Sequence, residues 1–196
     1  MTLPFDKNLS HLGWEEVKKR QLHRLPLADE WIDIVQMKPG HSVLDIGPGP
    51  GVFTIRYAEA VGDTGRITVL EKSREAIEYL VKYVSLLNFQ IRVLIGDAEK
   101  TDLTGLSPFH IIMLTDILHH TDSPTKLLKN IYENIPQKNT RVLISEFDPT
   151  SKGKFGPPLD KRLGDEYLLE IVKNIGFTVI SSNKQLFEHY YIVIEK

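Results

Sequence analysis

The stretch VLDIGPGPG, residues 43–51, places a short apolar run directly before three glycines at alternate positions. Val43, Leu44 and Ile46 predict a buried strand, and the residues that follow, 52–61, predict a helix. Glycine has no Cβ and tolerates positive φ, so three glycines at one strand-to-helix turn let a ligand lie against the main chain. The stretch therefore predicts a ligand at the carboxyl end of this strand, where open α/β sheets bind small molecules. A tight turn without a ligand is the alternative.

The composition limits the class of protein. The chain has 196 residues, of which 41% are hydrophobic and 26% are charged, as is typical of one globular domain. It contains no cysteine, which excludes disulfides, thiolate metal sites and a cysteine nucleophile. The formal net charge of -2 gives no overall attraction to nucleic acid. No apolar run is long enough to cross a membrane, and the amino terminus lacks a signal-peptide pattern, so the expected location is the cytoplasm.

Strand and helix patterns alternate through most of the chain. Strands are predicted at residues 42–46, 66–70, 91–95, 110–114 and 141–147, and helices at 52–61, 74–87, 123–135 and 165–175. This alternation is typical of a parallel sheet with helices on both faces. Two last strand patterns, 177–181 and 189–194, are joined by a link too short for a crossover helix, so we expect an antiparallel hairpin. The predicted fold is an α/β domain, residues 1–196, with a seven-stranded, mostly parallel sheet. Within it, residues 1–38 form helices that cover the site (14–20 and 27–37), and residues 39–196 form the core.

Two acids are placed to hold a nucleoside at the same edge of the sheet. Glu71 ends the second strand about twenty residues after Gly51, the position from which a carboxylate accepts both hydroxyls of a ribose. Asp97 follows the third strand and can accept a hydrogen bond from an exocyclic amino group. Each acid alone also fits a solvated strand end. Together with the glycine turn they predict a nucleoside site.

The turn 45–51, Glu71, the triplet 96–98, the stretch 114–120 and the terminal hairpin resemble those of the class I S-adenosylmethionine-dependent methyltransferases. The chain is most similar to the small methyltransferases related to ubiquinone and menaquinone biosynthesis. The resemblance implies a Rossmann-like fold and S-adenosylmethionine as the cofactor. His110 departs from the aspartate usual in the family, and Pro48 and Pro50 stiffen the glycine turn.

The resemblance also implies a role for each matching residue. The methionine moiety would lie along the three glycines, with its amino group near Asp45, while Glu71 takes the ribose and Asp97 the adenine. The implied cofactor-binding residues are Asp45, Gly47, Gly49, Gly51, Glu71, Lys72, Asp97, Ala98, Leu114 and Thr115.

Methyl transfer needs a base only when the acceptor carries a proton. Candidate bases are His119, His120, Glu146, Asp148 and His189, although each histidine could equally cap or pack. No metal site is expected, because adjacent histidines point in different directions and no third ligand lies at metal spacing. We expect His119 or Glu146 to assist deprotonation.

The acceptor is less constrained by the sequence than the cofactor. The loop 148–162 carries Lys152, Lys154, Lys161 and Arg162, so it could be a lid that brings positive charge to an anionic acceptor, with Arg162 orienting it. Solvation of a surface loop is the alternative for the lysines. The expected partner is a small-molecule acceptor, with no nucleic acid and no membrane insertion, and a homodimer is left open.

Two other functions are alternatives to a methyltransferase. A nicotinamide dehydrogenase needs a glycine where the chain has Val52, and a second set of parallel βαβ units where the chain has a hairpin. A protein that binds the cofactor without catalysis would share every binding residue, and only turnover distinguishes it.

Overall fold

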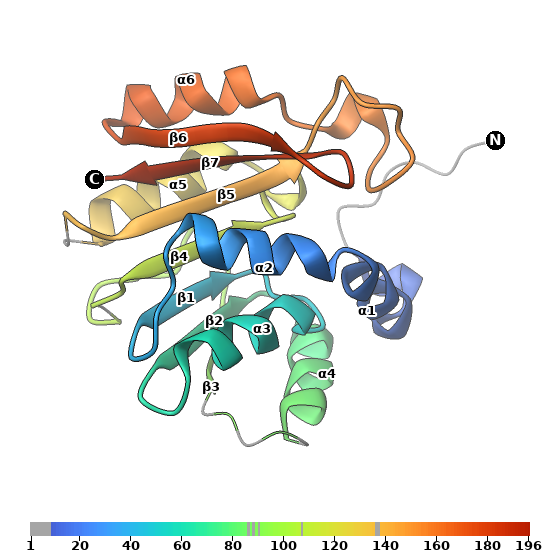
Figure 1. Ribbon diagram of the computed structural model, residues 1–196, viewed down its shortest axis with the longest axis vertical. Coiled ribbons are helices and arrows are strands. Elements are labelled where there is room, and N and C mark those ends of the chain that lie inside the picture. The colour runs from blue at the N-terminus through green and yellow to red at the C-terminus, as the bar shows by residue number, and fades with distance from the viewer. Residues whose placement is uncertain (1–8, 86, 88, 90, 107, 136–137) are drawn as a thin grey trace.

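Seven strands form one mixed sheet in the computed structural model, which describes residues 9–85, 87, 89, 91–106, 108–135 and 138–196 (Figure 1). The strands are β1 (Ser42–Ile46), β2 (Arg66–Glu71), β3 (Ile91–Ile95), β4 (Ile111–Thr115), β5 (Arg141–Phe147), β6 (Thr178–Gln185) and β7 (His189–Glu195). The helices are α1 (Trp14–His23), α2 (Leu25–Ile34), α3 (Val52–Val61), α4 (Arg74–Val84), α5 (Pro124–Asn134) and α6 (Asp165–Ile175), with short 3-10 turns η1 (Leu9–Leu12), η2 (Leu118–His120) and η3 (Leu159–Lys161). The predicted α/β fold is confirmed.

The strand order is β3-β2-β1-β4-β5-β7-β6, and the first five strands in the chain run parallel. Chain order reverses between β1 and β4, because β1 pairs with β2 on one side and with β4 on the other. Such a reversal opens a crevice outside the carboxyl ends of the two strands, where α/β folds bind ligands. The glycine turn predicted to meet a ligand follows β1 and therefore lies at this crevice.

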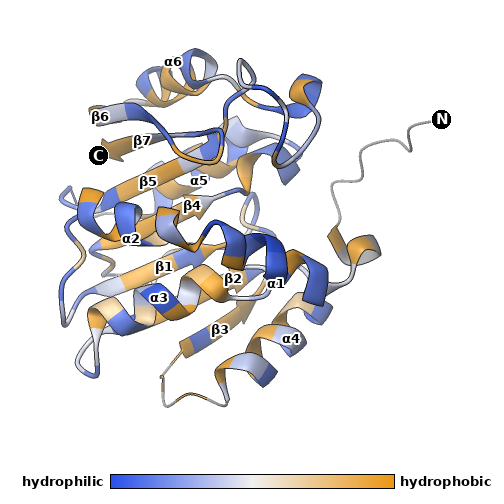
Figure 2. Cartoon of the chain, turned by 45° about the vertical axis from the view of Figure 1, so that its right-hand side comes forward, coloured by the Kyte–Doolittle hydropathy of each residue, from blue (hydrophilic) through white to orange (hydrophobic). Residues whose placement is uncertain are grey.

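The alternation of side chains along each strand divides the core into two layers. Val43 packs with α2, α3 and α4, whereas its neighbour Leu44 packs with α5 and α6 on the opposite face. Figure 1 shows α2 and α3 in front of the sheet and α5 behind it. Because both faces are covered, the central strands are apolar at nearly every position, as their colour in Figure 2 shows.

The terminal hairpin forms as predicted, but β6 is longer than the sequence indicated. β7 lies between β5 and β6 and is antiparallel to both. The predicted strand ended at Ser181, whereas the observed strand continues to Gln185, which pairs with His189. The polar run was expected to be a link, but β6 is an edge strand with one side open to solvent, where polar side chains are tolerated.

The two amino-terminal helices also differ in extent from the prediction. α1 continues to His23, three residues beyond the predicted end. α2 begins at Leu25 because Pro26 is accommodated in a first helical turn, where its missing N–H is not needed. It ends at Ile34, before the positive φ of 53° at Gln36. α4 ends at Val84, short of the predicted Leu87.

Candidate active site

The glycine turn between β1 and α3 needs glycine at all three alternate positions. The φ angles of Gly47, Gly49 and Gly51 are 73°, 55° and 85°, a region that favours glycine. A Cβ on Gly47 would lie 2.4 Å from Ile117 Cδ1, and a Cβ on Gly51 would lie 2.9 Å from Leu80 Cγ. At Gly49 the nearest atoms, from Trp14 and Gln21, would be 3.7 Å away. Space beside the main chain of this turn is therefore greatest at Gly49.

Asp45 lies beneath the turn, with 1% of its surface exposed. Its Oδ2 atom accepts a hydrogen bond of 2.6 Å from the Thr54 hydroxyl, which ties β1 to the first turn of α3. Burial raises the pKa of Asp45 to about 7, with a further contribution from the charge of Glu71, and the bond from Thr54 opposes the rise. A contact between Asp45 and the amino group of the cofactor stays a prediction.

Glu71 connects the end of β2 to the glycine turn. Its carboxylate accepts hydrogen bonds from the backbone N–H of Ser73 at 2.9 Å and of Gly49 at 3.4 Å. Burial raises the pKa of Glu71, although these backbone donors oppose the rise. Lys72 is exposed beside it. The side chain predicted to hold the ribose thus reaches the same turn as the glycines.

Asp97 and Ala98 follow β3, next to the end of β2 because Glu71 pairs with Ile95. The Oδ1 atom of Asp97 accepts from the backbone N–H of Glu99 at 3.0 Å, and Lys100 lies 3.0 Å from Oδ2. The Ala98 carbonyl accepts from Asn130 of α5 at 2.8 Å. The predicted residues at the ends of β1, β2 and β3 are thereby brought to one edge of the sheet. Leu114 and Thr115 end β4 at the same edge and are buried.

Helix α1 lies across this edge, at the end of the sheet toward which the parallel strands point (Figure 1). At its first turns, Lys18 lies 4.1 Å from the ring centroid of Tyr83 in α4. In its last turn, Gln21 donates to the Pro48 carbonyl at 3.4 Å and accepts from the Val52 N–H at 3.3 Å. The contact with Val52 satisfies a backbone donor at the start of α3. Sequence reasoning missed Gln21, and no pattern in the chain marks it.

The carboxyl end of α1 meets two segments that follow β5. The ring of His23 lies 5.6 Å from that of Phe155 and 5.5 Å from that of Phe187, between centroids. Phe155 belongs to the loop after β5, and Phe187 to the turn of the β6–β7 hairpin. These rings join α1, the loop and the hairpin over the ends of β4 and β5.

His119 and Glu146 form a buried pair at the ends of β4 and β5. His119 Nδ1 lies 2.6 Å from Glu146 Oε2, and the two side chains are 3% and 1% exposed. The other carboxylate oxygen accepts from the backbone N–H of Leu118 at 2.6 Å. Burial lowers the pKa of His119, but the Glu146 carboxylate outweighs burial, so the pKa lies above its ordinary value. Two predicted catalytic residues are thus in direct contact.

Asp116 forms a second buried network that sequence reasoning missed. It directly follows Thr115, has a φ of 56°, and accepts from Arg24 Nη2 at 2.6 Å and from His189 Nε2 at 2.8 Å. Burial alone would raise the pKa of Asp116, but Arg24 and His189 hold it well below the usual range. His189, a candidate base, therefore has one ring nitrogen on Asp116, and the other lies 2.8 Å from the Phe187 carbonyl.

Arg162, predicted to orient the acceptor, has its side chain engaged by its own loop. Its side chain is 0% exposed and donates to the carbonyls of Pro157 at 3.0 Å and Asp148 at 2.9 Å, and to the Ser151 hydroxyl at 2.6 Å. It also contacts the Phe155 carbonyl, and the Glu188 carboxylate at 3.1 Å. All three guanidinium nitrogens donate to the loop itself, and Nη1 also links the loop to Glu188 of the hairpin turn.

The three lysines of the loop agree with the alternative in which they keep a surface loop solvated. Lys152, Lys154 and Lys161 are exposed. Asp148, one of the candidate bases, accepts from the backbone N–H of Thr150 and lies 3.2 Å from Lys184 Nζ. The loop is thus braced from inside and presents its lysines to solvent.

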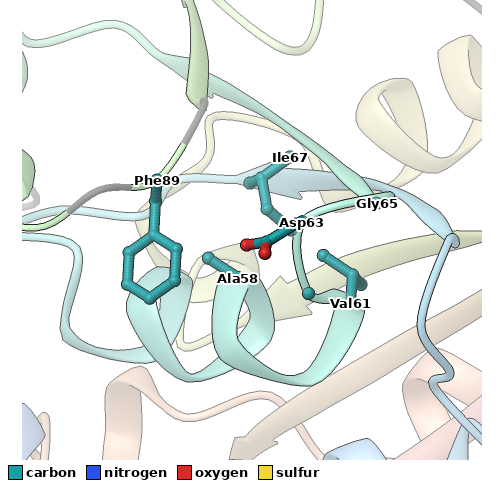
Figure 3. A pocket seen from close by; sticks show the side chains of 7 residues that line it. Ala58, Val61, Asp63, Gly65, Ile67 and Phe89 are labelled. Atoms are coloured by element: carbon teal, nitrogen blue, oxygen red, sulfur yellow. The ribbon is translucent and has the colours of Figure 1, made fainter.

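Two surface hollows lie at the opposite end of the sheet from the glycine turn. One, shown in Figure 3, lies between Phe89 and the last turn of α3, with Asp63 and Ile67 in its wall. Ten residues of helix separate Gly51 from Val61, about 15 Å at 1.5 Å per residue. The second hollow lies at the amino ends of β2 and β3, beside Arg66 and Arg92. Neither belongs to the edge that carries the predicted cofactor residues.

Two absences concern the part of the chain that the structure describes. No group of three or more histidine, aspartate or glutamate side chains there is arranged to hold a metal ion. No helix there is long and apolar enough to cross a membrane.

Curated relatives match parts of the chain. A protein-L-isoaspartate O-methyltransferase of Fervidobacterium nodosum is 31% identical over 117 residues, 57% of each chain. A ubiquinone/menaquinone biosynthesis C-methyltransferase of Haemophilus ducreyi is 25% identical over 154 residues, 76% of this chain and 56% of the relative. The chain spans about half the length of the curated relatives it matches.

The fold and the family are established by the two remaining comparisons. The crystal structure of a SAM-dependent methyltransferase from Aquifex aeolicus superposes with a TM-score of 0.83 at 19% identity, covering 97% of this chain and 98% of the other. The family model described as a methyltransferase domain matches residues 15–190. The chain therefore belongs to the methyltransferase domain family and is a class I member, whose cofactor is S-adenosylmethionine.

Proposed function

We propose that the protein transfers a methyl group from S-adenosylmethionine to a small-molecule acceptor with a hydroxyl group or an acidic carbon. The observation that carries this proposal is the buried Glu146–His119 pair at the carboxyl ends of β4 and β5. A histidine oriented by a carboxylate is the usual form of a general base. The pair lies at the edge that carries the glycine turn, which supports a base beside the proposed cofactor site.

The residues of this edge fit the cofactor. The three glycines leave the main chain open to the methionine moiety, with Gly49 the least crowded of them. We assign the ribose to Glu71, with Lys72 beside it, the adenine amino group to Asp97 and the adenine ring to the backbone of Ala98. Asp45, Gly47, Gly51, Leu114 and Thr115 complete the proposed cofactor site.

When bound, S-adenosylmethionine supplies a methyl group already activated by the sulfonium. The protein then has to hold the nucleophile in line with that methyl group, which can contribute about 7 to 11 kcal/mol. His119, held at 2.6 Å from Glu146 Oε2 through Nδ1, is the base that takes the proton of the acceptor in this proposal. Glu146 stabilises the resulting imidazolium, and its own place is fixed by the backbone of η2.

The names of the relatives suggest two kinds of acceptor, an isoaspartyl residue of a protein and the precursor of a quinone. Helix α1 lies across the proposed site, which supports a small-molecule acceptor. A folded protein or a long peptide would need open access to that site. His23, Phe155 and Phe187 close the space between α1, the loop and the hairpin. We propose that the chain acts as one domain whose residues 1–38 cover the site; of these, 1–8 lie outside the described residues.

Turnover with a labelled cofactor tests this proposal. The protein is incubated with S-adenosylmethionine carrying a tritiated methyl group and a panel of phenols, β-dicarbonyl compounds and an isoaspartyl peptide. We expect label to appear in a small acceptor and none in the peptide. Methylation of the peptide alone would contradict the small-molecule assignment. Binding of the cofactor without turnover on any acceptor would favour the non-catalytic alternative.

A further inference from the structure

Arg24 is a buried cation with an unused hydrogen-bond donor. It lies at the joint between α1 and α2 and is 8% exposed. Its Nη2 atom donates to Asp116, but its Nε atom is buried and has no hydrogen-bond partner among the residues that the structure describes. A buried donor without an acceptor is costly, especially on a charged group. An acceptor for Nε is therefore missing from the described part of the chain.

Asp116 cannot supply the missing acceptor. Its Oδ2 atom accepts from Arg24 Nη2, and its Oδ1 atom lies 2.8 Å from His189 Nε2. Both oxygens of this carboxylate are therefore already in hydrogen-bond contact, and neither reaches Arg24 Nε.

The other carboxylates nearby do not supply the acceptor either. Glu146 has one oxygen on the backbone of Leu118 and the other on His119. Glu188 accepts from Arg162 and from the backbone of Lys154. Because a buried donor on a charged group is costly without an acceptor, the unused Nε of Arg24 calls for an anionic acceptor.

Arg24 is also well placed to meet a ligand. Asp116, its partner, precedes Ile117, whose side chain lies against Gly47. Gln21, one turn earlier on α1, contacts the same glycine turn through Pro48. Arg24 therefore lies beside the segment to which the proposed function assigns the methionine moiety.

We propose that Arg24 binds a carboxylate inside the covered site. A guanidinium can hold Asp116 through one nitrogen and a second carboxylate through another, since its donors form a planar fork. The carboxylate is that of the cofactor's methionine group or that of an acidic acceptor. This inference rests on the proposed function, because it places the ligand at the same site.

The first experiment compares two ligands that differ by the amino-acid group. S-adenosylhomocysteine carries the carboxylate and 5′-methylthioadenosine lacks it, and calorimetry measures both with the wild type and with Arg24→Gln. If Arg24 binds the carboxylate of the cofactor, Arg24→Gln should weaken the binding of S-adenosylhomocysteine about 10- to 100-fold. The affinity for 5′-methylthioadenosine should stay unchanged. Arg56→Gln, which removes an arginine paired with Asp29 on the exposed side of α3, serves as the matched control and should change neither.

A second arm identifies an acceptor carboxylate. Benzoate and benzyl alcohol are added to the complex with S-adenosylhomocysteine, and the melting temperature is measured. If Arg24 binds the carboxylate of the acceptor, benzoate should raise the melting temperature of the wild type but not that of Arg24→Gln. Benzyl alcohol should change the melting temperatures of both proteins equally. Equal behaviour of both proteins toward all four compounds overturns the role of Arg24.

Two further outcomes keep the test decisive. If Arg24→Gln does not fold, Arg24→Lys replaces it, since it keeps the charge but loses the fork, and the same ligand selectivity is expected with a smaller loss. If the wild type binds neither nucleoside, the proposed function fails and this inference fails with it. If both proteins bind both nucleosides equally and ignore benzoate, only the role of Arg24 fails.

Discussion

The Nδ1 atom of His119 lies 2.6 Å from the Oε2 atom of Glu146, and both side chains are almost completely buried. A solvent-exposed pair of this kind would exchange partners with water, whereas this one is fixed on both sides by η2 and β5. The contact with the Glu146 carboxylate raises the pKa of His119 above its ordinary value.

Replacing His119 with alanine should lower turnover about 100- to 10,000-fold, the range expected for a general base. Cofactor affinity should stay unchanged, because the pair lies on the acceptor side. Steady-state kinetics and calorimetry with S-adenosylhomocysteine measure the two effects. His110→Ala is the matched control, since His110 lies at the amino end of the sheet, stacked on His41. Equal activity of both variants would mean that positioning alone drives the reaction.

The pH dependence of turnover should report the His119–Glu146 contact. Because the pKa of His119 is raised, the rate should increase with pH through a value above the ordinary imidazole pKa of about 6.5. In Glu146→Gln the raising charge is absent and burial remains, so the inflection should move to lower pH. A profile that is flat in both proteins would exclude His119 as the base.

Gly49→Ala should abolish tight cofactor binding while the fold persists. The φ of 55° disfavours any side chain by about 1 to 2 kcal/mol, yet no protein atom comes closer than 3.7 Å to the added Cβ. Gly105→Ala is the control, because its φ is 75° and no atom lies within 4 Å of the added Cβ. Both variants should lose similar stability in denaturant, and only Gly49→Ala should lose affinity for S-adenosylhomocysteine. Unchanged affinity would make the turn purely structural.

Arg162→Gln should destabilise the protein by about 3 to 5 kcal/mol, because it removes a buried cation and leaves Glu188 without its charged partner. Lys161→Gln, which removes an exposed pair with Asp160, should cost less than about 1 kcal/mol. Urea unfolding measures both. A stable Arg162→Gln with a raised KM for the acceptor would restore the substrate-orienting role that the hydrogen bonds argue against.

Asp45→Asn should make the apo protein less sensitive to alkali. The pKa of Asp45 is about 7 in the folded state and about 4 in the unfolded state. Its contribution to stability is therefore full below pH 4 and is lost as the pH rises through 7, by about 1.4 kcal/mol per pH unit in that interval. The variant should gain stability relative to the wild type between pH 5 and 8. Parallel stability curves for the two proteins would contradict the raised pKa.

The sequence predicted the fold well, and it predicted which residues meet at one edge of the sheet, for physical reasons that particular residues illustrate. Residues 43–51 combine a strand pattern with glycines that no other local structure needs, so both β1 and its turn were predictable. Glu71 and Asp97 follow strands whose carboxyl ends must meet in a parallel sheet. These are local patterns, and the topology converts them into a site.

The remaining features depend on contacts between distant segments. Arg24 and Asp116 are 92 positions apart, and nothing near either residue indicates that they pair. The guanidinium of Arg162 suggested a ligand contact, but the path of its own loop determines what this side chain contacts. The end of β6 was missed because pairing with β7, and not its own polar residues, makes it a strand.

Leu27, Ala28 and Trp31 of α2 are each 0% exposed and pack against β1 and α3 in the core. Residues of α1, in contrast, are mostly exposed, with Val17 and Gln21 the buried ones. The two amino-terminal helices therefore differ in the free energy needed to open them, and the division falls at Arg24 and not at residue 38. Amide hydrogens of α1 should exchange with solvent through local fluctuations, whereas those of α2 exchange only with the global unfolding of the domain. Passage of a ligand over the glycine turn then requires the opening of one short helix and leaves the hydrophobic core closed.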